Sequence, residues 1–136
     1  MAETLAVLIQ LAERRVDDVQ RALGMIRGHL REIADQMVRL EQEAAVAFVT
    51  AIAEDDVMAL QASGAFQERV RREVTRLKEL EAQLQGQERE KQRELQACFT
   101  EQKRFELLLE KQKLAARKER AKKMQNALDE VAGRKR

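Results

Sequence analysis

Apolar residues recur through the first part of the chain at alternating steps of three and four positions. Charged residues fill most of the places between them, as on the solvated face of a helix. Such an unbroken alternation is typical of two helices that wind around each other as a coiled coil. It predicts one helix over residues 3 to about 60. The series is Ala2, Leu5, Ile9, Ala12, Val16, Val19, Leu23, Ile26, Leu30, Ile33, Met37, Leu40, Ala44, Ala47 and Ala51.

The first strong interruption is Ser63-Gly64. Gly accepts the positive φ that ends a helix, and Ser can cap the next one, so we expect a turn at about residues 61–65. Helical spacing then returns over about residues 66–132, although Leu84 to Leu95 is a step of eleven residues that should locally unwind a supercoil. The apolar positions of this second helix are Phe66, Val70, Leu77, Leu80, Leu84, Leu95, Cys98, Phe105 and Leu109.

Two helices of similar length joined by a short turn pack as antiparallel neighbours. The predicted fold is therefore all-α, a two-helix antiparallel coiled-coil hairpin that occupies residues 1–136 as a single domain, with a basic tail at 133–136. A turn centred on Ser63-Gly64 would place Arg39 beside Glu88. It would also leave roughly ten C-terminal residues beyond the start of the first helix.

Composition supports a long helical hairpin over a compact domain. The chain has no Pro, Trp or Tyr, and 37% of its residues are charged. Its net charge is +2, but residues 1–110 sum to −5 and residues 111–136 to +7. The N-terminus does not resemble a signal peptide, and the longest apolar run, Ala44–Ala53, is too short to span a bilayer. We therefore expect a soluble, cytoplasmic protein.

No motif of catalysis or cofactor binding is present in the sequence. It has no phosphate-binding Gly-rich loop, and the single His29 and single Cys98 lack the partners of a triad or metal cage. We interpret His29 as a surface residue and Cys98 as a small apolar residue of the helix interface. The sequence predicts no enzyme activity, no catalytic or metal-binding residue and no cofactor.

The run "AAVAFVTAIA" (Ala44–Ala53) is apolar on nearly every face of its helix. A two-helix pair cannot bury all of these side chains. Either Phe66, Val70 and Val74 fold over the run near the turn, or the run is an exposed docking patch. The sequence favours neither alternative.

The C-terminal stretch "RKERAKKMQNALDEVAGRKR" carries a basic coat over an apolar stripe formed by Leu114, Ala121, Met124, Leu128 and Val131. A DNA-reading zipper places its basic region before the leucines, whereas here it follows them. No aromatic residue interleaves the basic residues, so base stacking and insertion into a membrane surface are poorly supported. The pattern favours a helix that docks onto a protein partner.

The two ends of the chain resemble the FliJ family of flagellar export proteins, which has YscO-like relatives in injectisomes. The resemblance lies in "LAVLIQLAERRVDDVQRALGMIRGHLREI", in "SGAFQERVRREVTRL" after the expected turn, and in "FELLLEKQKLAARKERAKKMQNALDEVA". One departure is the scarcity of aromatic residues around the turn, where family members often carry Tyr.

This resemblance implies a non-enzymatic part of a flagellar or type III export apparatus. It implies that the two chain ends insert into the ring of the export ATPase, that the turn side contacts the export gate, and that the protein assists export chaperones and their substrates. It implies a cytoplasmic location peripheral to the inner membrane through these partners. The residues of the basic stretch themselves indicate no specific nucleic acid partner.

The resemblance implies two sets of candidate binding residues, one for the gate and one for the ATPase. The gate-binding candidates on the turn side are Phe48, Val49, Ile52 and Phe66. The ATPase-binding candidates of the terminal coil are Leu5, Leu8, Arg14, Arg15, Arg117, Lys118, Arg120, Lys122, Lys123 and Leu128. Two other functions remain open from the sequence: a structural coiled coil that self-associates without an ATPase partner, and a coiled coil that binds nucleic acid.

Overall fold

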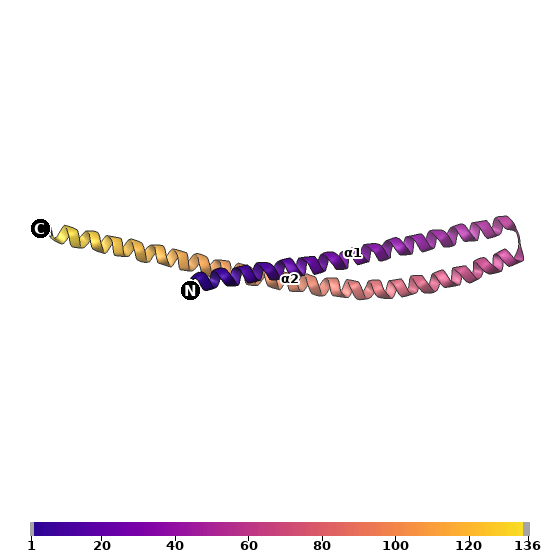
Figure 1. Ribbon diagram of the computed structural model, residues 1–136, viewed down its shortest axis with the longest axis horizontal. Helices are drawn as coiled ribbons and strands as arrows, with labels where there is room; N and C mark the ends of the chain where they lie inside the picture. Colours follow the sequence, from indigo (N-terminus) through magenta and orange to yellow (C-terminus); the bar gives the residue numbers. More distant parts are fainter. Residues whose placement is uncertain (1, 135–136) are drawn as a thin grey trace. The chain divides into compact units, whose positions relative to one another are not determined.

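The computed structural model describes residues 2–134 and consists of two long helices (Figure 1). Helix α1 is Ala2–Glu54 and helix α2 is Val57–Arg134. The described residues contain no strand, and the two helices pack against each other, which confirms the all-α helical hairpin. Of the basic tail expected at 133–136, the first two residues belong to α2, and 135–136 lie outside the described residues.

Contacts divide the chain into two units. The turn unit is Val19–Arg93, and the terminal unit combines the residues up to Asp18 with those from Glu94 onward. In each unit a segment of α1 packs on a segment of α2. The division on α2 falls just after Glu88 and Lys91, two charged residues on the buried side of that helix.

The chain reverses at Asp55-Asp56, so the turn predicted at residues 61–65 is wrong. Asp55 has a φ of 50°, a left-handed conformation that Asp adopts more readily than most residues and that often ends a helix. Asp56 caps α2, because its Oδ1 accepts a hydrogen bond from the Met58 backbone N–H at 3.2 Å. The Leu60 N–H donates to the Asp56 carbonyl at 3.0 Å and closes the first turn of α2.

Ser63 and Gly64 lie inside α2. Ser63 is buried in the helix interface, and its Oγ has no hydrogen-bond partner. Gly64 has a negative φ, and an added Cβ would meet no atom within 4 Å. Neither a left-handed backbone nor a close approach requires glycine here, so the Ser-Gly pair was a misleading turn signal.

The apolar series of α1 is the buried side of that helix, as predicted. Every member except Ala2 is buried or half-buried. In the turn unit the core includes Val19, Leu23 and Ile33 from α1, with Val70 and Leu77 from α2. In the terminal unit the buried residues are Leu5, Ala12 and Val16.

The buried side of α2 departs from the prediction in two ways. Leu80 is exposed, and Glu81 takes its place in the interface. The eleven-residue step from Leu84 to Leu95 contains two half-buried polar residues, Glu88 and Lys91, at the regular spacing. The buried or half-buried series runs Val70, Val74, Leu77, Glu81, Leu84, Glu88, Lys91, Leu95, Cys98, Gln102, Phe105, Leu109 and Gln112.

The shifted turn changes which residues face each other. In the turn unit, Arg27 Nε pairs with Glu88 Oε2 at 3.3 Å, so the expected Arg39–Glu88 pair is wrong. Nearer the turn, Gln67 Nε2 donates to the Ala44 carbonyl at 2.6 Å. In the terminal unit, Arg15 Nη1 pairs with Glu101 Oε2 at 3.2 Å. The two exposed ion pairs contribute little stability, but all three contacts mark the register of the helices.

Candidate functional site

The C-terminal part of α2 has no helix beside it. Arg15 faces Glu101 in the terminal unit, and α1 begins thirteen residues before Arg15, at Ala2. On an antiparallel partner, thirteen residues beyond Glu101 is Leu114. Every residue from 113 to 134 is exposed. The free segment is therefore about twenty residues long, not the ten that the sequence predicted, and it extends past the N-terminus of α1 in Figure 1.

This free segment carries the predicted apolar stripe, called the tail stripe below. Its members recur at steps of seven, three, four and three, so they lie on one face of the helix. Residues 113–134 carry seven Lys or Arg and three Asp or Glu, a net charge of +4. The tail stripe consists of Leu114, Ala121, Met124, Leu128 and Val131, and all five are exposed.

The α1 and α2 candidates of the expected terminal coil do not face each other. Leu5 is buried and Leu8 half-buried against α2, and Arg15 pairs with Glu101. The register that follows from this ion pair keeps these residues beside α2 positions before Leu114. The α2 candidates Arg117, Lys118, Arg120, Lys122, Lys123 and Leu128 lie beyond it on the single helix. The early turn is the cause, since it shortens α1 and lengthens α2.

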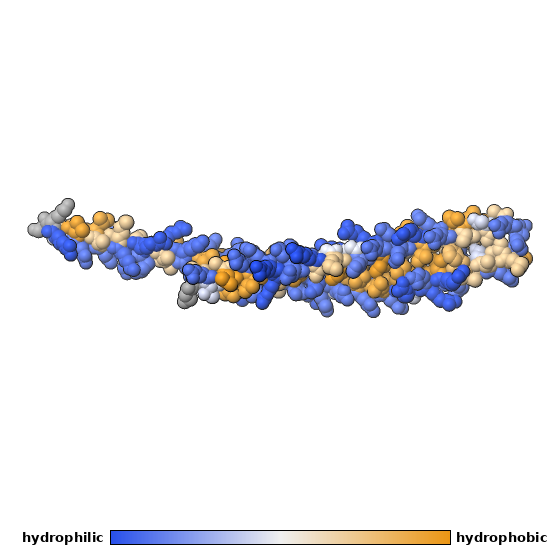
Figure 2. All heavy atoms as spheres, in the orientation of Figure 1, coloured by the Kyte–Doolittle hydropathy of each residue, from blue (hydrophilic) through white to orange (hydrophobic). Residues whose placement is uncertain are grey.

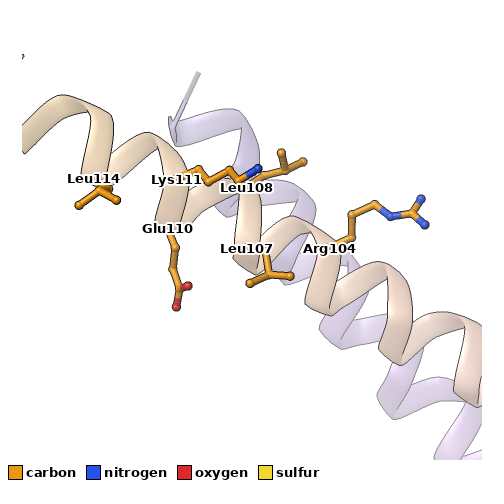
Figure 3. A pocket seen from close by; sticks show the side chains of 6 residues that line it. All are labelled: Arg104, Leu107, Leu108, Glu110, Lys111 and Leu114. Atoms are coloured by element: carbon orange, nitrogen blue, oxygen red, sulfur yellow. The ribbon is translucent and has the colours of Figure 1, made fainter. Parts of the chain in front are cut away.

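A hollow of about 400 Å³ precedes the tail stripe on α2. Figure 3 shows Leu107 and Leu114 on the same side of the helix with Glu110 between them. Leu107 and Leu108 are exposed, and neither was among the predicted site residues. The seven-residue spacing of Leu107, Leu114, Ala121 and Leu128 was the signal that could have included Leu107. The docking surface of the free helix therefore begins about two turns before Leu114.

The second surface lies in the turn unit. Phe48, Val49 and Ile52 are exposed, so these three residues are not covered by Phe66, Val70 and Val74. Phe66 is half-buried, and the Arg69 guanidinium carbon lies 5.8 Å from its ring centroid. Figure 2 shows apolar spheres gathered where the turn joins the helices.

Further exposed apolar residues enlarge this surface, called the turn patch below. Val57 and Met58 were missed because the sequence placed the turn after them, whereas they begin α2. Met58 is 77% exposed. The turn patch consists of Val46, Phe48, Val49, Ile52, Val57, Met58 and Leu60.

The residues of the turn patch lie in an acidic segment that Arg39 and Arg69 flank. Residues 40–68 contain six acidic residues and no Lys, Arg or His, a net charge of −6. Helix α1 also ends without a basic residue in its last turn. The acidic residues are Glu41, Glu43, Glu54, Asp55, Asp56 and Glu68. An apolar surface with an acidic surround selects partners that are apolar and basic.

Glu73 and Arg76 form an exposed ion pair on the surface of α2. Arg76 Nη2 lies 2.6 Å from Glu73 Oε1, and this hydrogen bond lowers the pKa of Glu73. The same hydrogen bond raises the pKa of Arg76. The pair is an i, i+3 contact on the helix surface and is outside both docking surfaces.

No group of three or more His, Cys, Asp and Glu side chains among residues 2–134 could hold a metal ion. Cys98 is half-buried on the helix interface, where it was expected. Neither α1 nor α2 contains, within the described residues, a stretch apolar enough to cross a membrane.

Comparison with known proteins gives one match. No curated protein and no solved structure matches the chain. The family model described as "Flagellar FliJ protein" matches residues 1–135, which is nearly the entire sequence. FliJ proteins are components of the flagellar export apparatus, and the helical hairpin found here agrees with the fold expected from the resemblance. The chain therefore belongs to the FliJ family of flagellar export proteins.

Proposed function

We propose that this protein couples the export ATPase ring to the export gate without catalysing a reaction itself. Membership of the FliJ family makes it a component of the flagellar export apparatus. The observation that carries the proposal is the free helix at 113–134, a basic amphipathic surface to which no other described segment is bound.

The free helix is the proposed ATPase-binding element. Its basic residues would attract acidic loops inside the ring and speed association, while the tail stripe would supply apolar contact. The hollow beside Leu107 and Leu108 extends this surface toward the point where α1 begins. The proposal for the α1 candidates is indirect: Leu5 and Leu8 hold the base of the free helix, and Arg14 is exposed next to Arg15, which pairs with Glu101.

The turn patch is the proposed gate-binding element, with Phe48, Val49 and Ile52 as its centre. Exposed apolar side chains that adjoin one another commonly mark a protein interface. The half-buried Phe66 would contribute its accessible edge. Export chaperones are further proposed partners, and the protein would be cytoplasmic and reach the inner membrane only through the apparatus.

Truncation tests the ATPase assignment. A chain that ends after Leu114 should keep its helical hairpin, because the helix interface ends near Gln112. It should no longer stimulate the ATP hydrolysis of the purified export ATPase. The matched control ends after Ala132 and keeps the entire tail stripe, so it should stimulate normally. Full stimulation by the shorter chain would refute the assignment.

Substitution tests the gate assignment. Phe48→Ser with Val49→Ser should weaken binding to the cytoplasmic part of the gate and leave the circular dichroism spectrum unchanged, because both side chains are exposed. Phe99→Ser, on an exposed phenylalanine outside the turn patch, is the control. Unchanged gate affinity in the double variant would show that the gate binds elsewhere.

A further inference from the structure

The chain carries two exposed apolar surfaces of opposite charge. The turn patch lies within residues 40–68, which have a net charge of −6 and no basic residue. The tail stripe lies within residues 113–134, which have a net charge of +4. Both surfaces have several large apolar side chains in water, and each therefore gains free energy when a partner covers it.

Charge decides which surfaces of two identical copies can meet. Two turn patches would bring together two acidic surrounds, and two tail stripes would bring together two basic coats. Each of these pairings is opposed by repulsion between like charges. A tail stripe on the turn patch of another copy buries apolar surface on both sides and brings opposite charges together.

The shapes of the two surfaces are also compatible. The tail stripe is one face of a single helix, and a helix can lay such a face along an apolar surface. Near the turn patch, a groove of about 560 Å³ is lined by Val46, Ala47 and Phe66. Arg39, Gln42 and Glu43 also line this groove, and Glu43 would meet the basic coat of an incoming helix.

We propose that the turn patch binds the free C-terminal helix of a second copy of this chain. The contact is heterologous, because it joins two different surfaces. However many copies are added, the assembly therefore still has one free turn patch and one free tail stripe. Association therefore continues with concentration and does not stop at a dimer. Self-association also covers both of the surfaces assigned above to the ATPase and the gate. Associated copies would therefore be unable to bind either partner through these surfaces.

Sedimentation velocity of the full-length chain without any partner tests the proposal. At about 0.05 M salt the weight-average sedimentation coefficient should rise steadily with protein concentration. At about 0.5 M salt, where charges on the surface are largely screened, it should stay close to the value of the single chain. A coefficient independent of concentration at low salt overturns the proposal, since it means a single chain or a contact within one copy.

Charge reversal identifies the surfaces. A tail variant carries Lys118→Glu, Lys122→Glu and Lys123→Glu, and a turn variant carries Glu41→Lys, Glu43→Lys and Glu54→Lys. All six residues are exposed, so both variants should keep the helicity of the natural chain. Each variant alone should lose the concentration dependence. An equimolar mixture should regain it, because the tail of the turn variant and the turn patch of the tail variant are unchanged.

A third variant controls for net charge. Arg72→Glu, Arg93→Glu and Lys103→Glu change three exposed residues outside both surfaces and shift the charge as much as the tail variant does. This control should associate like the natural chain. Association that survives in one of the two test variants would mean that like surfaces meet, which overturns the proposal. Failure of self-association leaves ATPase stimulation and gate binding untouched, so the proposed function is tested separately.

Discussion

Asp55 and Asp56 form the whole connection between the helices. Asp55 takes the left-handed conformation, and Asp56 supplies the side-chain acceptor for the start of α2. Both roles are known for Asp, but Ser63-Gly64 carried the residue types with the stronger statistical preference for them. The sequence contained the correct signal, and what it did not contain was the burial of Ser63 against α1, which depends on the partner helix.

Asp56→Ala should lower the free energy of unfolding by about 1 kcal/mol, the usual cost of losing an N-cap. The hydrogen bond from the Met58 N–H to Asp56 Oδ1 would have no replacement from Ala. Urea unfolding followed by circular dichroism measures this change. Asp56→Asn keeps a side-chain oxygen and should stay close to the natural chain. Equal losses in both variants would show that the cap is not the cause.

Ser63→Ala should raise the free energy of unfolding by about 1 kcal/mol, because the buried Oγ is removed from a site without a hydrogen-bond partner. The loss of one oxygen leaves little empty space. Thermal unfolding measures the gain as a higher midpoint. Thr50→Ala removes an exposed hydroxyl and should change stability by less than about 0.5 kcal/mol. A destabilised Ser63→Ala chain would indicate that water or a neighbour satisfies this hydroxyl.

Helix α1 was predictable from its sequence to within a few residues, except at its end. Fifteen apolar positions at regular spacing determine which side is buried, and the structure leaves only Ala2 of these exposed. Helix α2 was harder because its buried side includes Glu81, Glu88 and Lys91. Polar residues at interface positions have no hydropathy signal. The apolar positions alone therefore leave a gap from Leu84 to Leu95 and place the exposed Leu80 on the buried face.

Leu77 and Leu80 provide a matched test of that face. Leu77 is 2% exposed and Leu80 is 36% exposed, although both were expected to be buried. Leu77→Ala should lower the free energy of unfolding by about 2–5 kcal/mol, since it loses apolar contact and leaves a cavity. Leu80→Ala should lower the free energy of unfolding clearly less than Leu77→Ala does. Urea unfolding of the two variants compares them, and equal losses would place both residues in the interface.

For the whole chain, family membership and fold class followed from the sequence, while the docking surfaces followed only in part. The tail stripe was recognised, but its isolation from α1 was underestimated because that length depends on the turn position. The turn patch was recognised at Phe48, Val49 and Ile52 and missed at Val57 and Met58, for the same reason. One misplaced turn thus explains the main errors at both surfaces.

Amide hydrogen exchange should be slow in the paired helices before about residue 114 and faster in the segment after it. Short helices are only marginally stable in water, and residues 115–134 have no helix packed against them. Their amides should exchange at least about tenfold faster than those of the buried core around Val16 and Leu77. Mass spectrometry of peptic fragments resolves the two regions. Equal protection at low concentration would show that the C-terminal segment is stabilised by a contact that the single chain lacks.

The two-residue connection has a consequence for the reach of the C-terminal helix. Because only two residues connect the helices, the length of α1 determines how much of α2 is packed against it, and the rest of α2 is free. Deleting seven residues from the start of α1 would release one more heptad of α2, and adding seven would cover one, with every buried position kept in phase. The reach of the C-terminal helix can therefore be adjusted by genetic changes at the opposite terminus, without altering any residue of the tail stripe.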